Sequence, residues 1–236
     1  MKKMDLVSIT ISLVIGLIAF FVSNNIFVCI GVTLIYVLYY FVLARKIIKT
    51  YNLKTIKIKS CLYFINTFLI TLSIKDSLED AFEHASNNTD KEFQQLIYEM
   101  QEMNVNEKLD YLKKYYSYSS YRMFTKVISL YLDQGGNVLK ISESLLNEVV
   151  RIDETMNESE SSSKKKLVEF VILWLLTFLV LLFMRFALSE FYFSMLKSIP
   201  FFALLIVFFL LCLVSLHIFL KRFTKLPVNE EGELNG

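Results

Sequence analysis

The chain has 236 residues, 55% of them apolar, with 21 Phe and 13 Tyr but only 6 Gly and 2 Pro. This composition is too apolar for an ordinary soluble domain, and it favours helices. The formal net charge of +2 gives no reason to expect nucleic acid as a partner. Three distant cysteines, Cys29, Cys61 and Cys212, show no spacing typical of a zinc site or a disulfide framework. Membrane-spanning helices are the simplest interpretation, with the lipid bilayer as a partner and without a metal or another cofactor.

Four apolar runs are long enough to cross a bilayer, which requires about 20 apolar residues for about 30 Å of hydrocarbon. The predicted spans cover residues 6–23, 26–44, 167–184 and 201–220. Lys2 and Lys3 precede the first run as in a signal peptide, but Asp5 follows them and no A-x-A cleavage pattern is present. We therefore expect the first span to be retained. A short polar stretch separates it from the second span, which predicts a tight helical hairpin.

Small residues recur every four positions along the first span, at Ser8, Ser12 and Gly16, with Ala19 near the same face. Such a stripe lets another backbone approach closely. We therefore predict that a neighbouring helix packs against this face at Gly16.

Basic residues flank the apolar runs mainly on one side. Four groups lie there, at residues 2–3, 45–59, 164–166 and 221–225, whereas the opposite side holds only Arg185 and Lys197. The positive-inside rule then places both termini and the long central segment in the cytoplasm of a multi-pass protein of the inner (cytoplasmic) membrane. Glu190 follows Arg185 by about one helical turn. We expect these two side chains to form a local pair.

Between the predicted hairpins lies a hydrophilic segment, residues 45–166, which is large enough to bury a helical core of its own. Its apolar residues recur at helical spacing, and strand signals are weak. The predicted fold class is all-α: an integral membrane protein in which two transmembrane helical hairpins flank a cytoplasmic helical-bundle domain of about six helices. The predicted parts are an N-terminal hairpin at residues 1–44, this domain, a C-terminal hairpin at residues 167–220 and a cytoplasmic tail at residues 221–236.

Capping residues locate helix starts in the central segment. Ser73 with Asp76 predicts a start before the apolar run 74–85, and Thr89 with Glu92 predicts another. In both cases a side-chain oxygen at the first position can accept a hydrogen bond from an amide in the first helical turn.

Two further helices are expected, one opening at Asn104–Asn106 and one covering Ser119–Gln134. The pair Gly135-Gly136 then lets the backbone reverse where a side chain would clash, with positive φ at one glycine or both, and Asn137 can cap the long helix that follows. Within that helix, the polar run at residues 157–163 is predicted to be a solvated spacer, with a compliant joint as the alternative.

No catalytic motif is visible in the sequence. A phosphate-binding GxxxxGK loop, an HExxH zinc pair, a GxSxG elbow and a GxGxxG turn are all missing. His84 is interpreted as a solvated helix residue and His217 as an interfacial residue near the end of the last span. We therefore expect no enzymatic activity and assign no catalytic, cofactor-binding or metal-binding residue.

The central segment is acidic, because 17 Asp and Glu residues lie between Lys75 and Glu160 against 9 Lys and Arg residues. Such a domain repels nucleic acid and anionic lipid, whereas the basic groups beside the spans suit a lipid surface. We expect the domain to contact proteins and not nucleic acid.

Two stretches of the central segment resemble a known family. They are Thr71–Phe82 (TLSIKDSLEDAF) and Leu132–Leu139 (LDQGGNVL). With its order of a membrane hairpin, a helical domain, a long helix and a second hairpin, the chain resembles the type II secretion system F domain family. Its single-domain layout with four spans is similar to the TadB and TadC platform proteins of tight-adherence (Flp) pili. The resemblance covers roughly residues 60–220, and its most specific element is the Gly-Gly turn before a helix that bears Leu145 and Arg151.

The resemblance implies an inner-membrane platform protein that couples a cytoplasmic secretion ATPase to the assembly of pilin or pseudopilin. Better-known members carry two copies of the domain and this chain carries one, which implies association with itself or with a paralogue. Two alternatives remain: a membrane sensor or receptor subunit with a helical signalling domain, and a small transporter. A sensor should show an external ligand domain or an output motif, and a transporter should carry buried charge or broken helices at mid-membrane depth. Neither feature is visible in the sequence.

Overall fold

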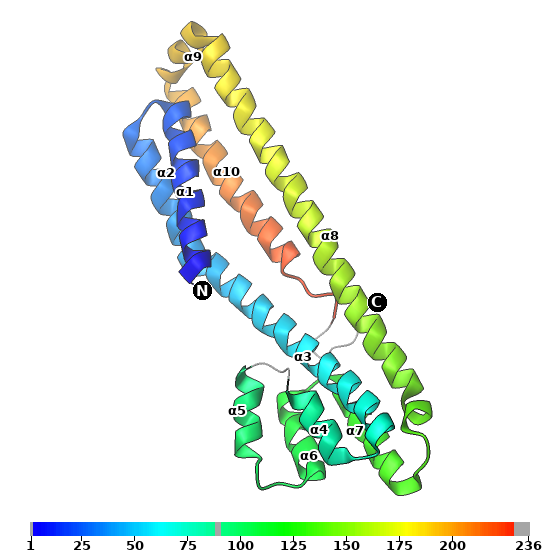
Figure 1. Ribbon diagram of the computed structural model, residues 1–236. Helices are drawn as coiled ribbons and strands as arrows, with labels where there is room; N and C mark the ends of the chain where they lie inside the picture. Colours follow the sequence, from blue (N-terminus) through cyan, green and yellow to red (C-terminus); the bar gives the residue numbers. More distant parts are fainter. Residues whose placement is uncertain (1, 88–90, 229–236) are drawn as a thin grey trace. The chain divides into compact units, whose positions relative to one another are not determined.

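The computed structural model describes residues 2–87 and 91–228, and within these ranges all of its elements are helices (Figure 1). The elements are α1 (Lys2–Ser23), α2 (Ile26–Tyr39), η1 (Tyr40–Ala44), α3 (Arg45–Lys75), α4 (Leu78–Ser86), α5 (Lys91–Glu99), α6 (Val105–Tyr115), α7 (Ser119–Gln134), α8 (Val138–Ala187), α9 (Ser189–Leu196) and α10 (Ile199–Phe223). Of these, η1 is a single π-helical turn. The predicted all-α class is confirmed for the part of the chain that the structure describes. The predicted cap Thr89 lies outside the described residues.

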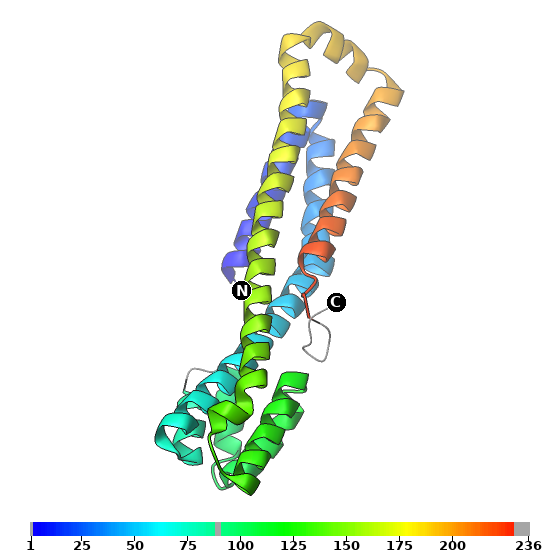
Figure 2. The same ribbon diagram turned by 90° about the vertical axis from the view of Figure 1, so that its right-hand side faces the viewer.

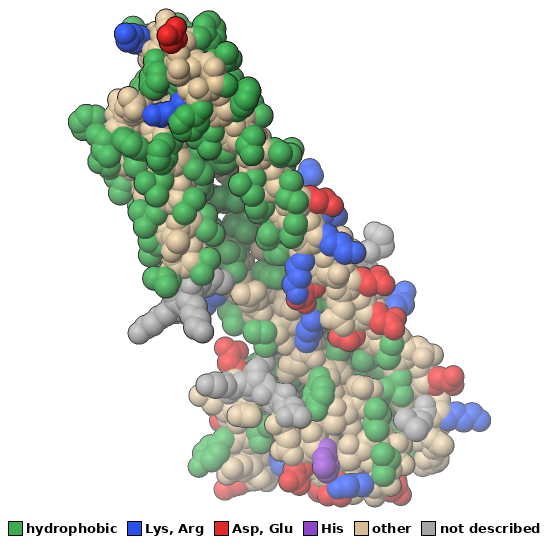
Figure 3. All heavy atoms as spheres, turned by 45° about the horizontal axis from the view of Figure 1, so that its top comes forward, with side chains coloured by type: hydrophobic (Ala, Val, Ile, Leu, Met, Phe, Trp, Pro, Cys, Tyr) green, Lys and Arg blue, Asp and Glu red, His purple; other side chains and the backbone are tan. Residues whose placement is uncertain are grey.

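The helices divide into two compact units. Residues 1–50 and 162–225 form the first, named here the apolar unit, and residues 51–161 with the segment from residue 226 form the second, the charged unit. On the face shown in Figure 3, hydrophobic side chains cover the helices of the apolar unit, whereas Lys, Arg, Asp and Glu gather over the charged unit. An apolar surface of this extent is unfavourable in water and favourable in hydrocarbon.

Four of the described helices are long and apolar enough to cross a membrane. They cover Asp5–Ser23, Ile26–Lys75, Lys140–Ala187 and Ile199–Phe223, and each contains one of the four predicted runs. The second predicted run ends at Ala44, but the helix does not, because α2 continues through η1 into α3. Likewise, α8 runs unbroken from Val138 to Ala187 (Figure 2). The polar run at residues 157–163 is therefore part of a continuous helix, since it contains neither Gly nor Pro to interrupt one.

The first two helices form the tight hairpin that the sequence predicts. Asn24 has a φ of 51°, and the side chain of Asn25 caps α2 by accepting a hydrogen bond from the Phe27 amide at 2.9 Å. Gly16 faces α2 so closely that an added Cβ would lie 1.9 Å from Oγ1 of Thr33. The predicted close approach at Gly16 is confirmed, and its partner is α2.

Aromatic rings join the other two long helices of the apolar unit. Phe170 of α8 stacks on Phe219 of α10, with ring centroids 4.4 Å apart. Trp174 and Phe178 of α8 both contact Phe208 of α10, at centroid distances of 6.1 and 6.2 Å. Edge-to-face and stacked ring pairs contribute about 0.5–1.5 kcal/mol each beyond area burial in soluble proteins. Ring packing therefore holds α8 to α10, whereas small residues hold α1 to α2.

Two buried tyrosine hydroxyls tie helices of the apolar unit to one another. Tyr36 of α2 donates a hydrogen bond to the Phe209 carbonyl at 3.1 Å, and Tyr192 of α9 donates to the Val22 carbonyl at 2.6 Å. A hydroxyl buried among apolar side chains is costly without an acceptor. The Phe209 carbonyl has a second lone pair beyond its helical bond, and the Val22 carbonyl lies in the last turn of α1, where carbonyls have no partner within the helix.

The core of the charged unit is centred on Phe64 of α3, which is fully buried. Its ring lies 5.6 to 6.3 Å from six others, those of Phe68, Phe82, Phe93, Tyr116, Tyr121 and Phe124. The buried Tyr121 hydroxyl donates to the Leu109 carbonyl at 3.0 Å. Residues of α3, α4, α5, α6, α7 and α8 all contribute to this core. The apolar stripes of the central segment therefore serve as core packing, as predicted.

The first helix start predicted in the charged unit is wrong by one turn. Helix α3 continues to Lys75, and Ser73 donates to the Ile70 carbonyl at 2.7 Å instead of capping. The start lies at Leu78, where Ser77 accepts a hydrogen bond from the Asp80 amide at 3.2 Å. Burial of Leu72, which is 1% exposed, favours continuation of α3 past the predicted cap.

The helix starts predicted at Asn104 and Ser119 agree with the structure. Asn104 and Glu107 form a capping box at the start of α6, with reciprocal hydrogen bonds of 2.9 and 3.2 Å. Helix α7 has the predicted bounds, Ser119–Gln134. Reciprocal capping leaves a strong local signal because both partners lie within four residues of each other.

Cys61 lies in the core of the charged unit, with 1% of its surface exposed. Burial raises the pKa of this thiol well above its ordinary value, because the thiolate would lose its hydration. Since the thiolate is the reactive form, we expect Cys61 to resist alkylation by N-ethylmaleimide at pH 8 in the native chain and to react in denaturant. Mass spectrometry of labelled peptides measures this difference. Equal labelling rates in the two conditions would contradict the buried position.

Candidate functional site

The turn between α3 and α4 lies in the first of the two stretches that carry the family resemblance. Asp76 has a φ of 52°, in the left-handed region that a non-glycine residue rarely adopts. Its amide still donates to the Leu72 carbonyl at 2.9 Å. The positive φ turns the chain out of α3, and Ser77 then caps α4.

The turn between α7 and α8 lies in the second stretch. Gly135 and Gly136 have φ values of 65° and 102°. Asn137 accepts a hydrogen bond from the Lys140 amide at 3.3 Å and so caps α8. The predictions of positive φ at the glycine pair and of capping by Asn137 are both confirmed.

Tyr131 joins these two turns. Its carbonyl accepts a hydrogen bond from the Gly135 amide at 2.8 Å, and its hydroxyl donates to Oδ1 of Asp76. That bond to Asp76 raises the pKa of Tyr131, because loss of the phenolic proton would remove the bond and place a second negative charge beside the carboxylate. We name Asp76, Tyr131, Gly135 and Gly136 the motif junction. The two stretches of the resemblance thus meet at one place in the charged unit.

Lys75 and His84 lie next to the motif junction. The Lys75 ammonium is 3.3 Å from Oδ2 of Asp80 and 3.1 Å from Nε2 of His84. His84 is exposed, as the sequence interpretation expects. Exposed ion pairs of this kind contribute about 0–1 kcal/mol. The cluster orders the surface of α4 and offers no enclosed space in which a substrate could react.

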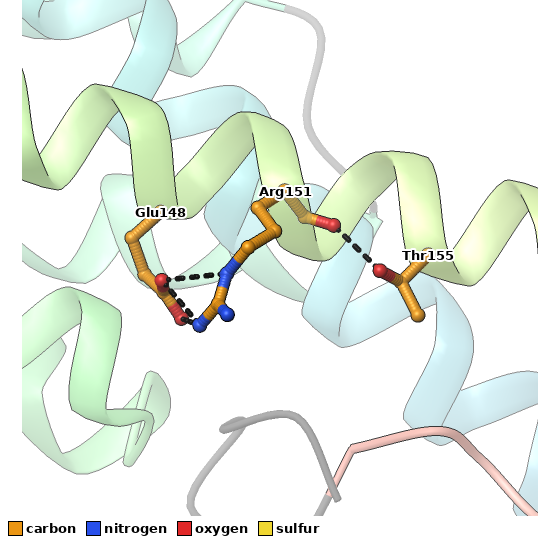
Figure 4. A network of polar contacts seen from close by, with 3 residues as sticks. All are labelled: Glu148, Arg151 and Thr155. Atoms are coloured by element: carbon orange, nitrogen blue, oxygen red, sulfur yellow. Dashed lines mark hydrogen bonds and ion pairs between the residues drawn. The ribbon is translucent and has the colours of Figure 1, made fainter. Parts of the chain in front are cut away.

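Arg151, the arginine of the resemblance, lies on α8 within the charged unit. Its guanidinium donates to both carboxylate oxygens of Glu148 at 2.7 to 3.0 Å, and its carbonyl accepts a hydrogen bond from Thr155 at 2.8 Å (Figure 4). The arginine side chain is 64% exposed. This i, i+3 pair supports the helix surface by a few tenths of a kcal/mol.

A groove of about 470 Å³ opens between α4, α5 and α6 of the charged unit. Its lining combines acidic, apolar and basic side chains: Glu79, Phe82, Glu83, Ser86, Asn87, Gln94, Ile97, Val105 and Lys108. The Lys108 ammonium lies 5.4 Å from the centroid of the Phe82 ring. Glu79 and Glu83 of this lining are exposed, whereas Phe82 is 5% exposed.

Two consecutive tyrosines of the apolar unit reach different helices where α2 meets η1. The hydroxyl of Tyr39 lies 3.2 Å from Nδ1 of His217 in α10. The hydroxyl of Tyr40 donates to Asp5 of α1 at 2.9 Å, and Asp5 also lies 3.6 Å from Arg45. The π-helical turn begins at Tyr40. His217 therefore takes part in a contact between α2 and α10 as well as lying near the end of α10.

The predicted pair between Arg185 and Glu190 is not formed. Arg185 donates to Oδ1 of Asn24 at 3.4 Å, and the described residues include no ion pair between it and Glu190. Helix α8 ends at Ala187, and the intervening Leu188 has φ and ψ of −120° and 43°. A spacing of five residues across a helix break does not keep two side chains on one face.

The side chains in the described ranges can stabilise helices and contact other molecules. Within residues 2–87 and 91–228, no group of three His, Cys, Asp or Glu side chains could hold a metal ion. Comparison of the chain with family models, with curated proteins and with solved structures found no match. The sequence predicts the Gly135-Gly136 turn of the motif junction but places the helix start near Asp76 one turn too early. It does not predict the bond between Tyr131 and Asp76, because a contact across 55 residues leaves no local pattern.

Proposed function

We propose that this chain is an integral membrane platform protein of a secretion or pilus machine. Its four long apolar helices would cross the inner membrane as two hairpins, and the charged unit would lie in the cytoplasm. The chain would couple a cytoplasmic secretion ATPase to the assembly of pilin or pseudopilin, in association with itself or with a paralogue. It would transmit movement and perform no catalysis.

Helix continuity carries this proposal. The helix Ile26–Lys75 and the helix Val138–Ala187 each run without a break from the apolar unit into the charged unit. A continuous helix resists bending more strongly than a loop, because each turn is held by backbone hydrogen bonds. A force on the charged unit would then be transmitted to the spans along the backbones of these two helices.

The motif junction supports the same proposal. It links the last residues of the helix Ile26–Lys75, through Asp76 and Tyr131, to the turn from which α8 begins. The ends of both stiff helices are thus fixed to each other inside the charged unit. An ATPase that displaced one end would displace the other as well.

Topology is the first expected result of the proposal. Reporters fused after Asn25 or Ser194 should behave as external, and reporters fused at Asn88 or after Lys225 as cytoplasmic, because the basic flanks lie on one side of the spans. Paired alkaline phosphatase and fluorescent protein fusions measure this directly. A cytoplasmic signal from the Ser194 fusion would overturn the arrangement with four spans.

The partner prediction is tested by crosslinking in native membranes. Full-length chain purified after crosslinking should carry a secretion-type ATPase and a prepilin or pseudopilin, whereas an unrelated multi-pass protein from the same membranes should carry neither. Recovery of copies of the chain alone, without either partner, would contradict the platform role and leave the membrane topology unaffected.

A further inference from the structure

The guanidinium of Arg185 occupies an unusual place in the apolar unit. It lies two residues before the end of α8, with its central carbon 5.9 Å from the ring centroid of Phe21 and 5.5 Å from that of Phe193. Its Nη2 donates to Oδ1 of Asn24 at 3.4 Å, a long hydrogen bond to a neutral acceptor. Its Nη1 is buried and has no hydrogen-bond partner. Two rings and one amide therefore surround a permanent positive charge.

This arrangement leaves the charge without a negative partner. An arginine carries five N–H donors and stays protonated in proteins. The rings of Phe21 and Phe193 attract the cation but accept no strong hydrogen bond. No carboxylate lies within ion-pair distance of Arg185 among the residues that the structure describes. A charge held beside apolar groups needs an anion to offset its lost hydration.

The surroundings of Arg185 indicate which anion is available. The large apolar side chains that follow it are exposed, with Phe186 at 71%, Phe191 at 59% and Ile199 at 84%. Exposed rings and aliphatic side chains next to a cation at the end of an apolar helix are typical of the boundary between hydrocarbon and lipid headgroups. Long basic side chains near helix ends reach that boundary. The phosphates of phospholipids lie at this depth.

We propose that Arg185, held between Phe21 and Phe193, binds the phosphate of a phospholipid headgroup. The side chain remains partly exposed, and on binding a rotation of the guanidinium would present Nη1, which is buried and unpaired without lipid, to a phosphate oxygen. Charge-assisted bonds from a guanidinium to phosphate are short and strong. The site rests on the membrane-spanning part of the proposed function and does not depend on the platform role.

Native mass spectrometry of the full-length chain tests the site. Delipidated protein in detergent is titrated with dioleoyl phosphatidylcholine, with monoolein, which has no phosphate, and with inorganic phosphate. We expect one phosphatidylcholine to be retained by the wild type and the retention to weaken about tenfold in Arg185→Gln, as loss of one charge-assisted contact would produce. Monoolein and inorganic phosphate should not be retained at this site.

Matched variants separate phosphate binding from a structural role. Lys197→Gln removes the other basic residue at this end of the unit and should leave retention unchanged. Phe193→Leu keeps the charge and should weaken retention about threefold, which keeps the test valid if Arg185→Gln does not fold.

Three results would overturn the assignment. Equal retention by wild type and Arg185→Gln would show that Arg185 holds no lipid. Retention of inorganic phosphate at the same site would assign it to free phosphate. Loss of a copurifying protein from Arg185→Gln, with lipid retention unchanged, would assign the guanidinium to an acidic side chain of a partner.

Discussion

Replacing Gly16 with leucine is expected to separate the first two helices of the apolar unit. An added Cβ at Gly16 would lie 1.9 Å from Oγ1 of Thr33 and 3.4 Å from the Cys29 carbonyl oxygen. Thr33 cannot yield easily, because its hydroxyl is bonded to that same carbonyl at 2.8 Å. Overpacking at a helix contact costs about 1–3 kcal/mol, and we expect a fall in the melting temperature of the full-length chain of roughly 5–10 °C. Thermal unfolding in detergent measures the change.

Gly31 provides the matched control for this prediction. It lies on α2, the partner helix, and an added Cβ there meets nothing within 4 Å. Gly31→Leu should therefore melt close to the wild type. Adding Thr33→Ala to Gly16→Ala should recover part of the stability that Gly16→Ala loses, because the nearest clashing atom is removed. Equal melting temperatures for Gly16→Leu and Gly31→Leu would contradict the close approach of α1 and α2.

Gly136→Val is expected to destabilise the motif junction. Gly136 has a φ of 102°, a conformation that a β-branched residue tolerates poorly. The strain lies in the backbone alone, because an added Cβ would meet nothing within 4 Å. We expect a loss of about 1–3 kcal/mol in the free energy of unfolding. In cells, the full-length variant should insert normally and fail to support assembly, because the start of α8 is displaced.

Gly136→Asn is the control for the backbone conformation. Asparagine adopts positive φ more readily than other residues that carry a Cβ, so this variant should lose less stability than Gly136→Val. Urea unfolding of both variants, followed by circular dichroism, measures the difference. A valine variant as stable as the wild type would show that the turn does not need glycine, and it would weaken the resemblance on which the platform proposal rests.

Local signals in the sequence predict the parts of this fold that depend on few residues. The apolar runs predict the long helices because hydrophobicity adds along a segment whatever its neighbours are. The helix start at Asn104 and the Gly135-Gly136 turn are predicted because the residues that determine them lie within a few positions of each other. The motif junction is predicted in part, since the Gly135-Gly136 turn carries its own residues whereas the helix start near Asp76 is predicted one turn too early.

Contacts between distant segments explain what the sequence does not predict. Ser73 has the residue type of a cap, but burial of Leu72 and its neighbours in the core extends α3 past it. Glu190 follows Arg185 by five residues in the sequence, yet the side chains that contact Arg185 are those of Asn24, Phe21 and Phe193. In each case tertiary packing outweighs a local preference worth about 1 kcal/mol or less.

The π-helical turn at Tyr40–Ala44 changes the direction in which the side chains of α3 point relative to those of α2, within the continuous helix Ile26–Lys75. Each residue of an α-helix advances the side-chain direction by about 100°, and a turn closed by i to i+5 bonds takes one residue more. The faces of α3 are therefore offset by about 100° from the positions reached by counting onward from α2. Conversion of this turn to α-helical geometry would rotate the faces of α3 about the helix axis without breaking the helix. The π-helical turn therefore sets the direction in which the faces of α3 point about the helix axis.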